Sequence, residues 1–346
     1  MLTPNAIPKR NHGCRIETDL KLWGQRAVVL QNEVLRVTVL AGRGADIVEF
    51  LYKPLDVDFM WANPNGPVKE DASLPPQEAL KAFNHYYSGG WQELFPHGSR
   101  SVESYGTDFY LHGEVWGLPW DVRIEEDTPE RIAVTFTCRT RQTPFVLERR
   151  MTLTSGSPVV QLDETAHNFG RRGLDIMWGH HPAFGAPFLS RDCRLYANAK
   201  TLNVNLKHRT TWPIGEYEGK REDYSRCLAP RSGKGRMLYL EDLNEGWYAL
   251  VNPKLKVGFG MRWNKRQFPV VWIWQEAGGK QSPFFGNGYA TAVEPFSHLP
   301  FARERKEKLM RVPAGKSITA RFEAFAIPGG KPIRTGAELK KALTKD

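Results

Sequence analysis

Alternation of apolar and polar residues is the feature of this sequence that most constrains its fold. In Arg131–Arg139 the apolar side chains recur at every second position, and the same period runs through Ser317–Ala326 and Leu35–Val39. Met151 and Leu153 repeat it between polar neighbours. Because successive side chains of a strand point to opposite faces, this period predicts strands with one buried face.

Turn-forming residues separate these runs. The 346 residues include 31 Gly and 24 Pro, which predict many turns and therefore many short strands. Helical periodicity is limited to Pro76–Phe83 and to Thr335–Lys345, where Thr335 is a candidate N-cap. The loop Asn63–Pro76 is interpreted as an insertion between strands. We predict an all-β protein, in which residues 1–346 form a single large antiparallel β-sandwich of two packed sheets with few short helices.

Charge and cysteine content favour a soluble intracellular protein. The formal net charge is +10, but Lys and Arg are scattered, and no zinc-finger, helix-turn-helix or RNP pattern accompanies them, so nucleic acid is not predicted as a partner. The excess charge suits an anionic small substrate or a solvated basic surface. The four cysteines have no CxxC spacing, and Cys138 is predicted to be a buried thiol. With neither an apolar signal core nor a membrane-length apolar run, a cytoplasmic location is expected.

Several familiar motifs do not occur in the sequence. No GxGxxG follows a strand, and the patterns GxxxxGK[ST], GxSxG and HExxH do not occur. The sequence therefore gives no support to nucleotide binding, to a hydrolase nucleophile elbow or to a helical zinc site.

Four segments interrupt the strand pattern and combine polar residues with Gly and aromatic residues. They are Gly89–Arg100, Leu111–Glu114, Trp178–Phe184 and Ala292–Ser297. Loops of this composition on a rigid sheet commonly form a pocket.

Taken in order, these segments resemble the aldose 1-epimerase (galactose mutarotase-like) family. The family has a proline-containing loop that ends in Asn-Arg, a Leu-His-Gly step, a mid-chain His-Pro-x-Phe motif and a Glu-Pro-aromatic segment near the C-terminus. The resemblance covers roughly residues 28 to 327. It implies a β-sandwich whose cleft holds a sugar, and a cofactor-independent isomerase that interconverts the α and β anomers of a hexose. We predict that catalysis needs no metal.

The resemblance also assigns the chemistry of ring opening to particular residues. We expect a base and an acid on opposite sides of the bond between C1 and the ring oxygen, one to take the proton of the hydroxyl at C1 and the other to give a proton to the ring oxygen. Glu294 corresponds to the family's general base, and burial in its apolar segment would raise its pKa. His181 corresponds to the acid, because it directly precedes the Pro-x-Phe step, and a histidine pKa lies near neutral pH. His180 is then predicted to point to the opposite face of an extended segment.

Substrate binding is predicted for four further residues. The resemblance implies that His112 and Arg100 bind the sugar, although Ser99 replaces the Asn of the Asn-Arg step. Trp274, which shares a strand face with Trp272, is a candidate stacking wall for the sugar, with Gln275 nearby. Such a pair of tryptophans more often belongs to the core.

Other polar residues remain without an assigned role. The family's sugar-binding aspartate has no clear counterpart, although Asp223 and Asp242 are possible. His97, Glu93 and Glu114 could shape substrate choice or, with His112, bind a metal.

Three classes of function remain open. The first is a mutarotase acting on a free or charged hexose, the second is a non-catalytic carbohydrate-binding protein on the same fold, and the third is another sugar-processing enzyme such as a lyase or hydrolase. The sequence does not specify the sugar or the oligomeric state.

Overall fold

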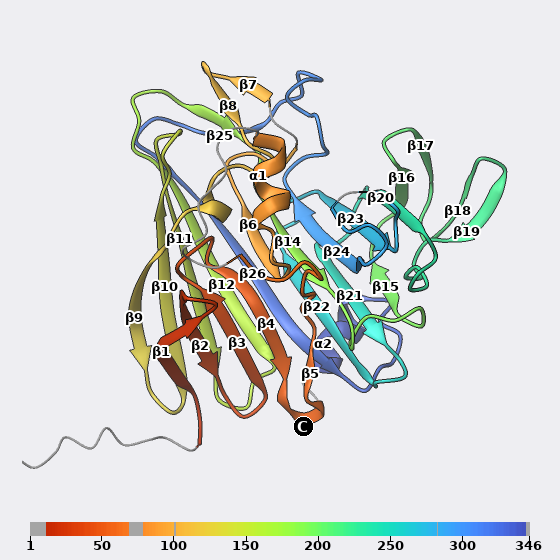
Figure 1. Cartoon of the computed structure of the whole chain (residues 1–346), viewed down its shortest axis with the longest axis horizontal. Helices are drawn as coiled ribbons and strands as arrows, with labels where there is room; N and C mark the ends of the chain where they lie inside the picture. The colour runs from red at the N-terminus through yellow and green to blue at the C-terminus, as the bar shows by residue number, and fades with distance from the viewer. Residues whose placement is uncertain (1–11, 69–78, 100–101, 282, 344–346) are drawn as a thin grey trace, which may run out of the picture.

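The computed structural model describes residues 12–68, 79–99, 102–281 and 283–343, and it consists mainly of antiparallel strands in two large sheets (Figure 1). The first sheet has twelve strands. In spatial order they are β1 (Arg15–Leu22), β2 (Gln25–Gln31), β3 (Leu35–Leu40), β4 (Asp46–Tyr52), β6 (Trp91–Leu94), β14 (Gly179–Phe184), β24 (Tyr289–Phe296), β23 (Val270–Ala277), β20 (Lys234–Glu241), β16 (Thr201–Val204) and β17 (His208–Thr211), with β5 (Val57–Asp58) paired to β4.

The second sheet has eight strands and is also antiparallel. Its order is β15 (Arg194–Ala197), β21 (Trp247–Asn252), β22 (Val257–Trp263), β26 (Ser317–Pro328), β12 (Val159–Asn168), β11 (Phe145–Thr154), β10 (Arg131–Arg139) and β9 (Asp121–Asp127). Three small two-stranded sheets complete the set: β7 (Val102–Ser104) with β8 (Thr107–Phe109), β13 (Leu174–Ile176) with β25 (Met310–Val312), and β18 (Ile214–Tyr217) with β19 (Lys220–Asp223).

Helices are few and short. In the described ranges they are α1 (Ala79–Tyr86), α2 (Gly336–Leu343) and two 3₁₀ turns, η1 (Lys53–Leu55) and η2 (Val115–Gly117). The hydroxyl Oγ1 of Thr335 accepts a hydrogen bond from the backbone N–H of Glu338 at 3.1 Å, so Thr335 is the N-cap of α2, as its position in the sequence predicts. Residues 76–78 of the first predicted helix lie outside the described residues.

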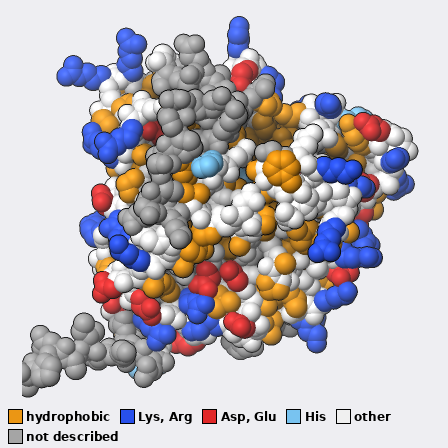
Figure 2. Space-filling view, viewed as in Figure 1, with side chains coloured by type: hydrophobic (Ala, Val, Ile, Leu, Met, Phe, Trp, Pro, Cys, Tyr) orange, Lys and Arg blue, Asp and Glu red, His pale blue; other side chains and the backbone are white. Residues whose placement is uncertain are grey.

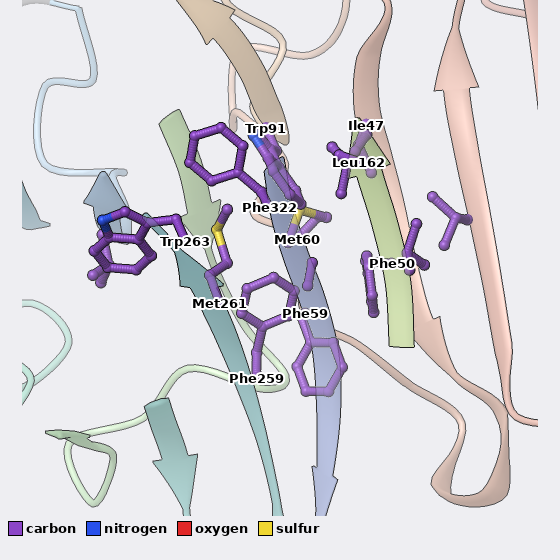
Figure 3. Packing of buried hydrophobic residues seen from close by; sticks show 14 of the residues in the cluster. Ile47, Phe50, Phe59, Met60, Trp91, Leu162, Phe259, Met261, Trp263 and Phe322 are labelled. Atoms are coloured by element: carbon purple, nitrogen blue, oxygen red, sulfur yellow. The ribbon is translucent and has the colours of Figure 1, made fainter. Parts of the chain in front are cut away.

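The core lies between the two large sheets. Figure 3 shows Phe50 of β4 and Phe59, which follows β5, next to Phe259 of β22. The ring centroids of Phe50 and Phe259 are 5.1 Å apart in an edge-to-face contact, which is a favoured geometry for aromatic pairs. Trp91 of β6 also points into this layer and packs against Phe259. The two sheets therefore share one apolar interior, and the other face of the first sheet is left for a site.

The predicted fold class is confirmed. The alternating segment Arg131–Arg139 is strand β10, and Ser317–Ala326 lies within β26. Cys138 is buried, as its place in the alternation predicts. In the first half of β26 the alternation matches the burial, because Ala320 and Phe322 are buried and Thr319 and Arg321 are exposed. In β10 the middle of the strand is buried on both faces, at Ala133 and Thr135 as well as at Val134.

The excess of basic residues is spread over the surface. On the face that Figure 2 shows, Lys and Arg side chains are scattered around the periphery among Asp and Glu, and hydrophobic side chains gather nearer the middle. Many of the basic residues form exposed ion pairs, such as Arg36 with Glu49. Within the described part of the chain, none of the helices has the length and apolarity that crossing a membrane would require.

Candidate active site

One row of side chains runs straight across the first sheet. The register pairs Gly179 with Phe296 and Ala183 with Ala292, so His181 of β14 stands directly opposite Glu294 of β24. Glu294 is in turn paired with Trp272 of β23, and Trp272 with Tyr239 of β20. Cross-strand partners share a face of the sheet. The hydrogen-bond register therefore aligns an imidazole, a carboxyl group and two aromatic rings from four neighbouring strands of the sheet.

His181 and Glu294 are in contact at the centre of this row. Atom Nε2 of His181 lies 3.5 Å from Oε1 of Glu294, and the two residues are 4% and 1% exposed. Burial raises the pKa of Glu294 well above its usual value and lowers the pKa of His181 to about 4. The raised carboxyl pKa agrees with the prediction. The lowered pKa of His181 differs from the expected near-neutral value, because the ring is removed from water, and at neutral pH it is an uncharged imidazole.

Both side chains line the floor of a cavity of about 750 Å³, a volume within the usual range of small-molecule sites. Its walls are largely aromatic: Phe83, Tyr87, Trp272, Trp274 and Phe284. The side chain of Phe83, in the middle of α1, packs edge-on against the ring of His181 of β14, and Figure 1 draws α1 above β6 and β14. Flat apolar walls with a few polar groups at the floor suit a pyranose ring, which has C–H faces and a hydroxyl rim.

Tyr87 contacts the imidazole ring of His181 at Nδ1, whereas Glu294 lies next to the other ring nitrogen, Nε2. Its hydroxyl lies 3.3 Å from Nδ1 of His181, and its ring packs edge-on against the imidazole at 5.3 Å between centroids. Tyr87 is buried, and desolvation followed by the nearby carboxyl group of Glu294 raises its pKa well above the usual value, so the hydroxyl stays protonated. No sequence motif marks Tyr87, which lies in the segment His85-Tyr86-Tyr87 between the proline-rich loop and β6.

His112 also lines the cavity. Its ring centroid is 5.4 Å from that of His181 and 4.5 Å from that of Phe83. Burial, followed by the neighbouring His181, lowers its pKa well below the usual value, and the ring bonds to the backbone carbonyl of Gly98. Its Nδ1 is buried and has no hydrogen-bond partner among the described residues. A neutral ring that donates to a carbonyl retains one nitrogen that can accept a hydrogen bond from a ligand hydroxyl.

The two tryptophans of β23 and their neighbour Gln275 lie on opposite faces of the strand. Trp272 and Trp274 line the cavity, and Trp274 contacts the imidazole of His181 at 6.1 Å between ring centroids. Gln275 follows Trp274 and points the other way, where its Oε1 accepts a hydrogen bond from Nε of Arg236 at 2.7 Å. It is not among the residues that line the cavity, because one step along a strand reverses the direction of a side chain.

Arg100, predicted to bind the sugar, lies outside the described residues. Its neighbours Gly98 and Ser99 line the cavity, and Oγ of Ser99 accepts a hydrogen bond from the backbone N–H of Phe301. Lys280 is the one Lys or Arg among the described lining residues, and it is exposed at the cavity's edge.

A second polar cluster lies between the two large sheets, on the face of β6 and β14 that is turned to the interior. Nε2 of His180 is 3.2 Å from Oε2 of Glu164, and Nδ1 is 3.5 Å from Oε2 of Glu93. Arg149 lies 3.5 Å from Glu93. This confirms that His180 points away from His181. The group Glu93, Glu164 and His180 has the spacing of a metal site, but Arg149 already provides a positive charge to it. Burial raises the pKa of Glu93 to about 8 and of Glu164 to about 7.

The remaining polar candidates do not gather at the cavity. Glu114 accepts hydrogen bonds from the backbone N–H groups of residues 141–143, so it holds a turn and does not join His112 in a cluster. His97 stacks on Phe109. Asp223 pairs with Arg194, and Asp242 accepts a hydrogen bond from Thr201. Neither aspartate is among the described residues that line the cavity.

Comparisons with solved structures place this fold among mutarotase-like proteins. A candidate aldose 1-epimerase from Klebsiella pneumoniae superposes with a TM-score of 0.73 at 16% identity, covering 95% of this chain and 85% of that one. A galactose mutarotase-like protein from Clostridium acetobutylicum gives 0.64 at 14% identity, with 91% and 99% covered. A candidate aldose 1-epimerase from Escherichia coli K12 gives 0.62 at 16% identity, with 88% and 100% covered. At these identities the likeness establishes the fold.

Sequence comparisons define the family more narrowly. None of the curated proteins matches the sequence. A family model described as a domain of unknown function, DUF4432, matches residues 22–323, which include β2 to β24 and every described residue of the cavity. The fold is thus the galactose mutarotase-like sandwich that the sequence resemblance implies, and the chain belongs to the DUF4432 family.

Proposed function

We propose that this protein is a mutarotase that interconverts the α and β anomers of a hexose or of a charged hexose derivative. The observation that carries the proposal is the contact between His181 and Glu294 at the floor of an aromatic cavity of sugar size. The mutarotase-like solved structures agree with it at the level of the fold.

Ring opening requires action on two oxygens bonded to the same carbon. The hydroxyl oxygen and the ring oxygen are both attached to C1, so two adjacent protein groups can reach them from one side. The adjacency of His181 and Glu294 fits this arrangement better than a base and an acid on opposite sides of the sugar. The Oε2 atom of Glu294 is buried and has no hydrogen-bond partner among the described residues, which leaves it able to accept the hydroxyl proton.

The proposed reaction begins with Glu294 as a carboxylate. It takes the proton of the hydroxyl at C1, a C1–O double bond forms, and the bond between C1 and the ring oxygen breaks. The N–H at Nε2 of His181 donates a hydrogen bond to the ring oxygen as negative charge develops there. Glu294 then gives the proton to that oxygen. After rotation about C1–C2 the same steps run in reverse, the ring closes on the other face of the aldehyde, and both residues return to their starting state.

The neutral state of His181 modifies the acid role expected from the resemblance. A pKa of about 4 leaves few imidazolium ions at neutral pH. We infer that His181 stabilises charge as an uncharged hydrogen-bond donor and that Glu294 carries the proton between the two oxygens.

The test is a measurement of anomer exchange by NMR on a panel of hexoses, including neutral, 6-phosphorylated and sulfonated forms. The wild-type protein should accelerate exchange of at least one sugar, and Glu294→Gln should reduce kcat by about 10²- to 10⁴-fold, the usual contribution of general acid–base catalysis. Glu164→Gln makes the same change at a buried carboxyl group of the interior cluster and should retain activity. An unchanged rate in Glu294→Gln would contradict the mechanism.

A carbohydrate-binding protein would give a different result in the same experiment. The tryptophans of the cavity wall would report sugar binding by a change in fluorescence, whereas anomer exchange would remain at its rate in buffer.

A further inference from the structure

We propose that Tyr87 is a positioning residue, which fixes the tautomer of His181 so that the proton of the neutral imidazole lies on Nε2, facing Glu294 and the ligand. This inference rests on the proposed function for its catalytic consequence. The tautomer itself can be measured on the protein without a substrate.

The first step of the argument concerns the hydroxyl of Tyr87. In the described part of the structure its hydrogen-bond partner is Nδ1 of His181, at 3.3 Å. The raised pKa of Tyr87 keeps its proton in place, so the hydroxyl has a proton to donate. If Nδ1 also carried a hydrogen, the buried O–H would have no acceptor among the described residues, and leaving a buried donor unsatisfied is unfavourable. Nδ1 is therefore the acceptor, and the hydrogen of the neutral ring lies on Nε2.

The second step concerns the alternative that Tyr87 excludes. The backbone carbonyl of His181 lies close enough to its own ring to raise the pKa of the imidazole, against the larger lowering caused by burial. Nδ1 is the ring nitrogen nearer to the backbone, so this carbonyl would favour a hydrogen on Nδ1. That tautomer would leave a lone pair on Nε2, directed at Oε1 of Glu294 3.5 Å away. With Glu294 ionised, the state from which the proposed reaction begins, two acceptors would then face each other, and the imidazole would offer no donor to the ring oxygen of a sugar.

The third step concerns the other groups around the imidazole. Phe83 from α1 and Trp274 from β23 contact the ring through their aromatic faces or edges and offer no charge. His112 lies 5.4 Å away between centroids and is neutral, because burial lowers its pKa. Glu294 is the ionisable group that contacts Nε2. Among the described residues that contact His181, Tyr87 is therefore the one that places a hydroxyl group at Nδ1.

The packing around Tyr87 holds its hydroxyl in this position. Its ring stacks on Phe83 at 4.9 Å between centroids, with 24° between the ring planes, and also contacts Trp61 at 5.5 Å. Because the ring is fixed by its aromatic neighbours, Tyr87→Phe should keep the packing and remove the hydroxyl alone.

The experiment is ¹⁵N NMR of the imidazole rings, between pH 6 and 8, in full-length protein whose histidines are labelled with ¹⁵N. The variant His181→Gln lacks the signals of residue 181 and so assigns them. We expect the wild type to show a protonated Nε2 and an unprotonated Nδ1. Tyr87→Phe should shift the ring towards hydrogen on Nδ1 and should lower kcat by about threefold to tenfold, the effect of losing one hydrogen bond. Tyr248→Phe is the matched control, because it removes another buried phenol hydroxyl, one with no hydrogen-bond partner among the described residues.

Each result decides a separate point. A wild-type ring with hydrogen on Nδ1 overturns the inference, whether or not Tyr87→Phe folds. A loss of activity in Tyr87→Phe without a change of tautomer also overturns it, since the role of Tyr87 would then be structural packing. If the tautomer changes as expected but neither protein accelerates anomer exchange, the proposed function fails and the assignment of the tautomer stands.

Discussion

His181 and Glu294 lie directly opposite each other on the adjacent antiparallel strands β14 and β24, with Nε2 and Oε1 3.5 Å apart. Because strand pairing is held by backbone hydrogen bonds on both sides, this distance depends on the central part of the sheet and not on a mobile loop. The pair is built on rigid elements, which suits the proposed action on two oxygens of one carbon.

The first prediction concerns the imidazole. His181→Phe keeps an aromatic ring next to Phe83 and Trp274 but removes the hydrogen-bond donor. We expect kcat for anomer exchange to fall by about 10²- to 10³-fold, as when one donor to a developing oxyanion is removed. The measurement is exchange NMR at saturating sugar. A fall in affinity with an unchanged kcat would show that His181 only binds the ligand.

The pH dependence of the rate is the second prediction. The base must be ionised, and burial raises the pKa of Glu294 well above its usual value. Activity should therefore be lost as the pH falls through this raised pKa, well above the ordinary carboxyl range, and should increase on the alkaline side. A profile of kcat against pH measures this. An acid limb near the ordinary carboxyl pKa of about 4.3 would contradict the assignment of Glu294 in its buried state.

Substrate affinity should depend on His112. His112→Phe keeps the edge-to-face contact with Phe83 and removes the ring nitrogens, one of which has no described partner. We expect KM to rise by about tenfold, the effect of losing one hydrogen bond to a buried group, with a smaller change in kcat. Steady-state kinetics measures both. If kcat and kcat/KM fell equally and KM did not change, His112 would instead contact the sugar only in the transition state.

Lys280 is predicted to discriminate charged from neutral sugars. It is exposed at the cavity's edge, where it could meet a phosphate or sulfonate group. Lys280→Gln should raise KM for such a sugar by about twofold to fivefold and leave KM for the neutral hexose unchanged. Lys316→Gln, at an exposed lysine that does not line the cavity, is the control. The same KM for both sugars in Lys280→Gln as in the wild type would exclude this role.

The interior cluster should make stability depend on pH. The pKa values of Glu93 and Glu164 are raised by burial to about 8 and about 7, from an ordinary value of 4.5. Folding thus favours the protonated carboxyl groups. Their contribution to stability is complete below the ordinary pKa and is lost as the pH rises through about 7 to 8.

Glu164→Gln removes one of these titrations, so the fall in Tm between pH 6 and pH 9 should be shallower than in the wild type. Thermal unfolding followed by circular dichroism measures it. Glu323→Gln, which breaks a surface pair with Arg262, should keep the wild-type slope. Parallel curves for Glu164→Gln and the wild type would contradict the prediction.

The sequence allowed the fold class and much of the cavity to be predicted. Segments such as Ser317–Glu323 reveal their strands because one face is buried and the other is largely exposed. His112, His181 and Glu294 occur in short motifs whose composition marks a pocket, whereas Trp274 was a candidate only from the strand face that it shares with Trp272. All four line the same cavity. Glycine and aromatic neighbours make such segments recognisable, since they are the residues that allow backbone and ligand to approach closely.

Other features needed the folded chain. Gln275 was predicted to lie near the sugar, but its side chain points away from the cavity. Which side chains of β23 face the cavity is decided by which face of the strand meets the core. Tyr87 has no motif, and its hydroxyl reaches His181 only because aromatic packing with Phe83 brings the segment after α1 over β14. The pKa of His181 could not be inferred from residue type, since it depends on how completely the surrounding walls exclude water.

The sequence by itself determined an antiparallel sandwich, because a period of two is a local property of each strand and requires only one buried face. The sequence also pointed to His181 and Glu294 as candidates, because each lies in a short local motif. Their contact, their protonation and the third residue that orients the imidazole were decided by the tertiary structure alone. These depend on strand register and burial, which arise when segments far apart in the sequence pack together and exclude water.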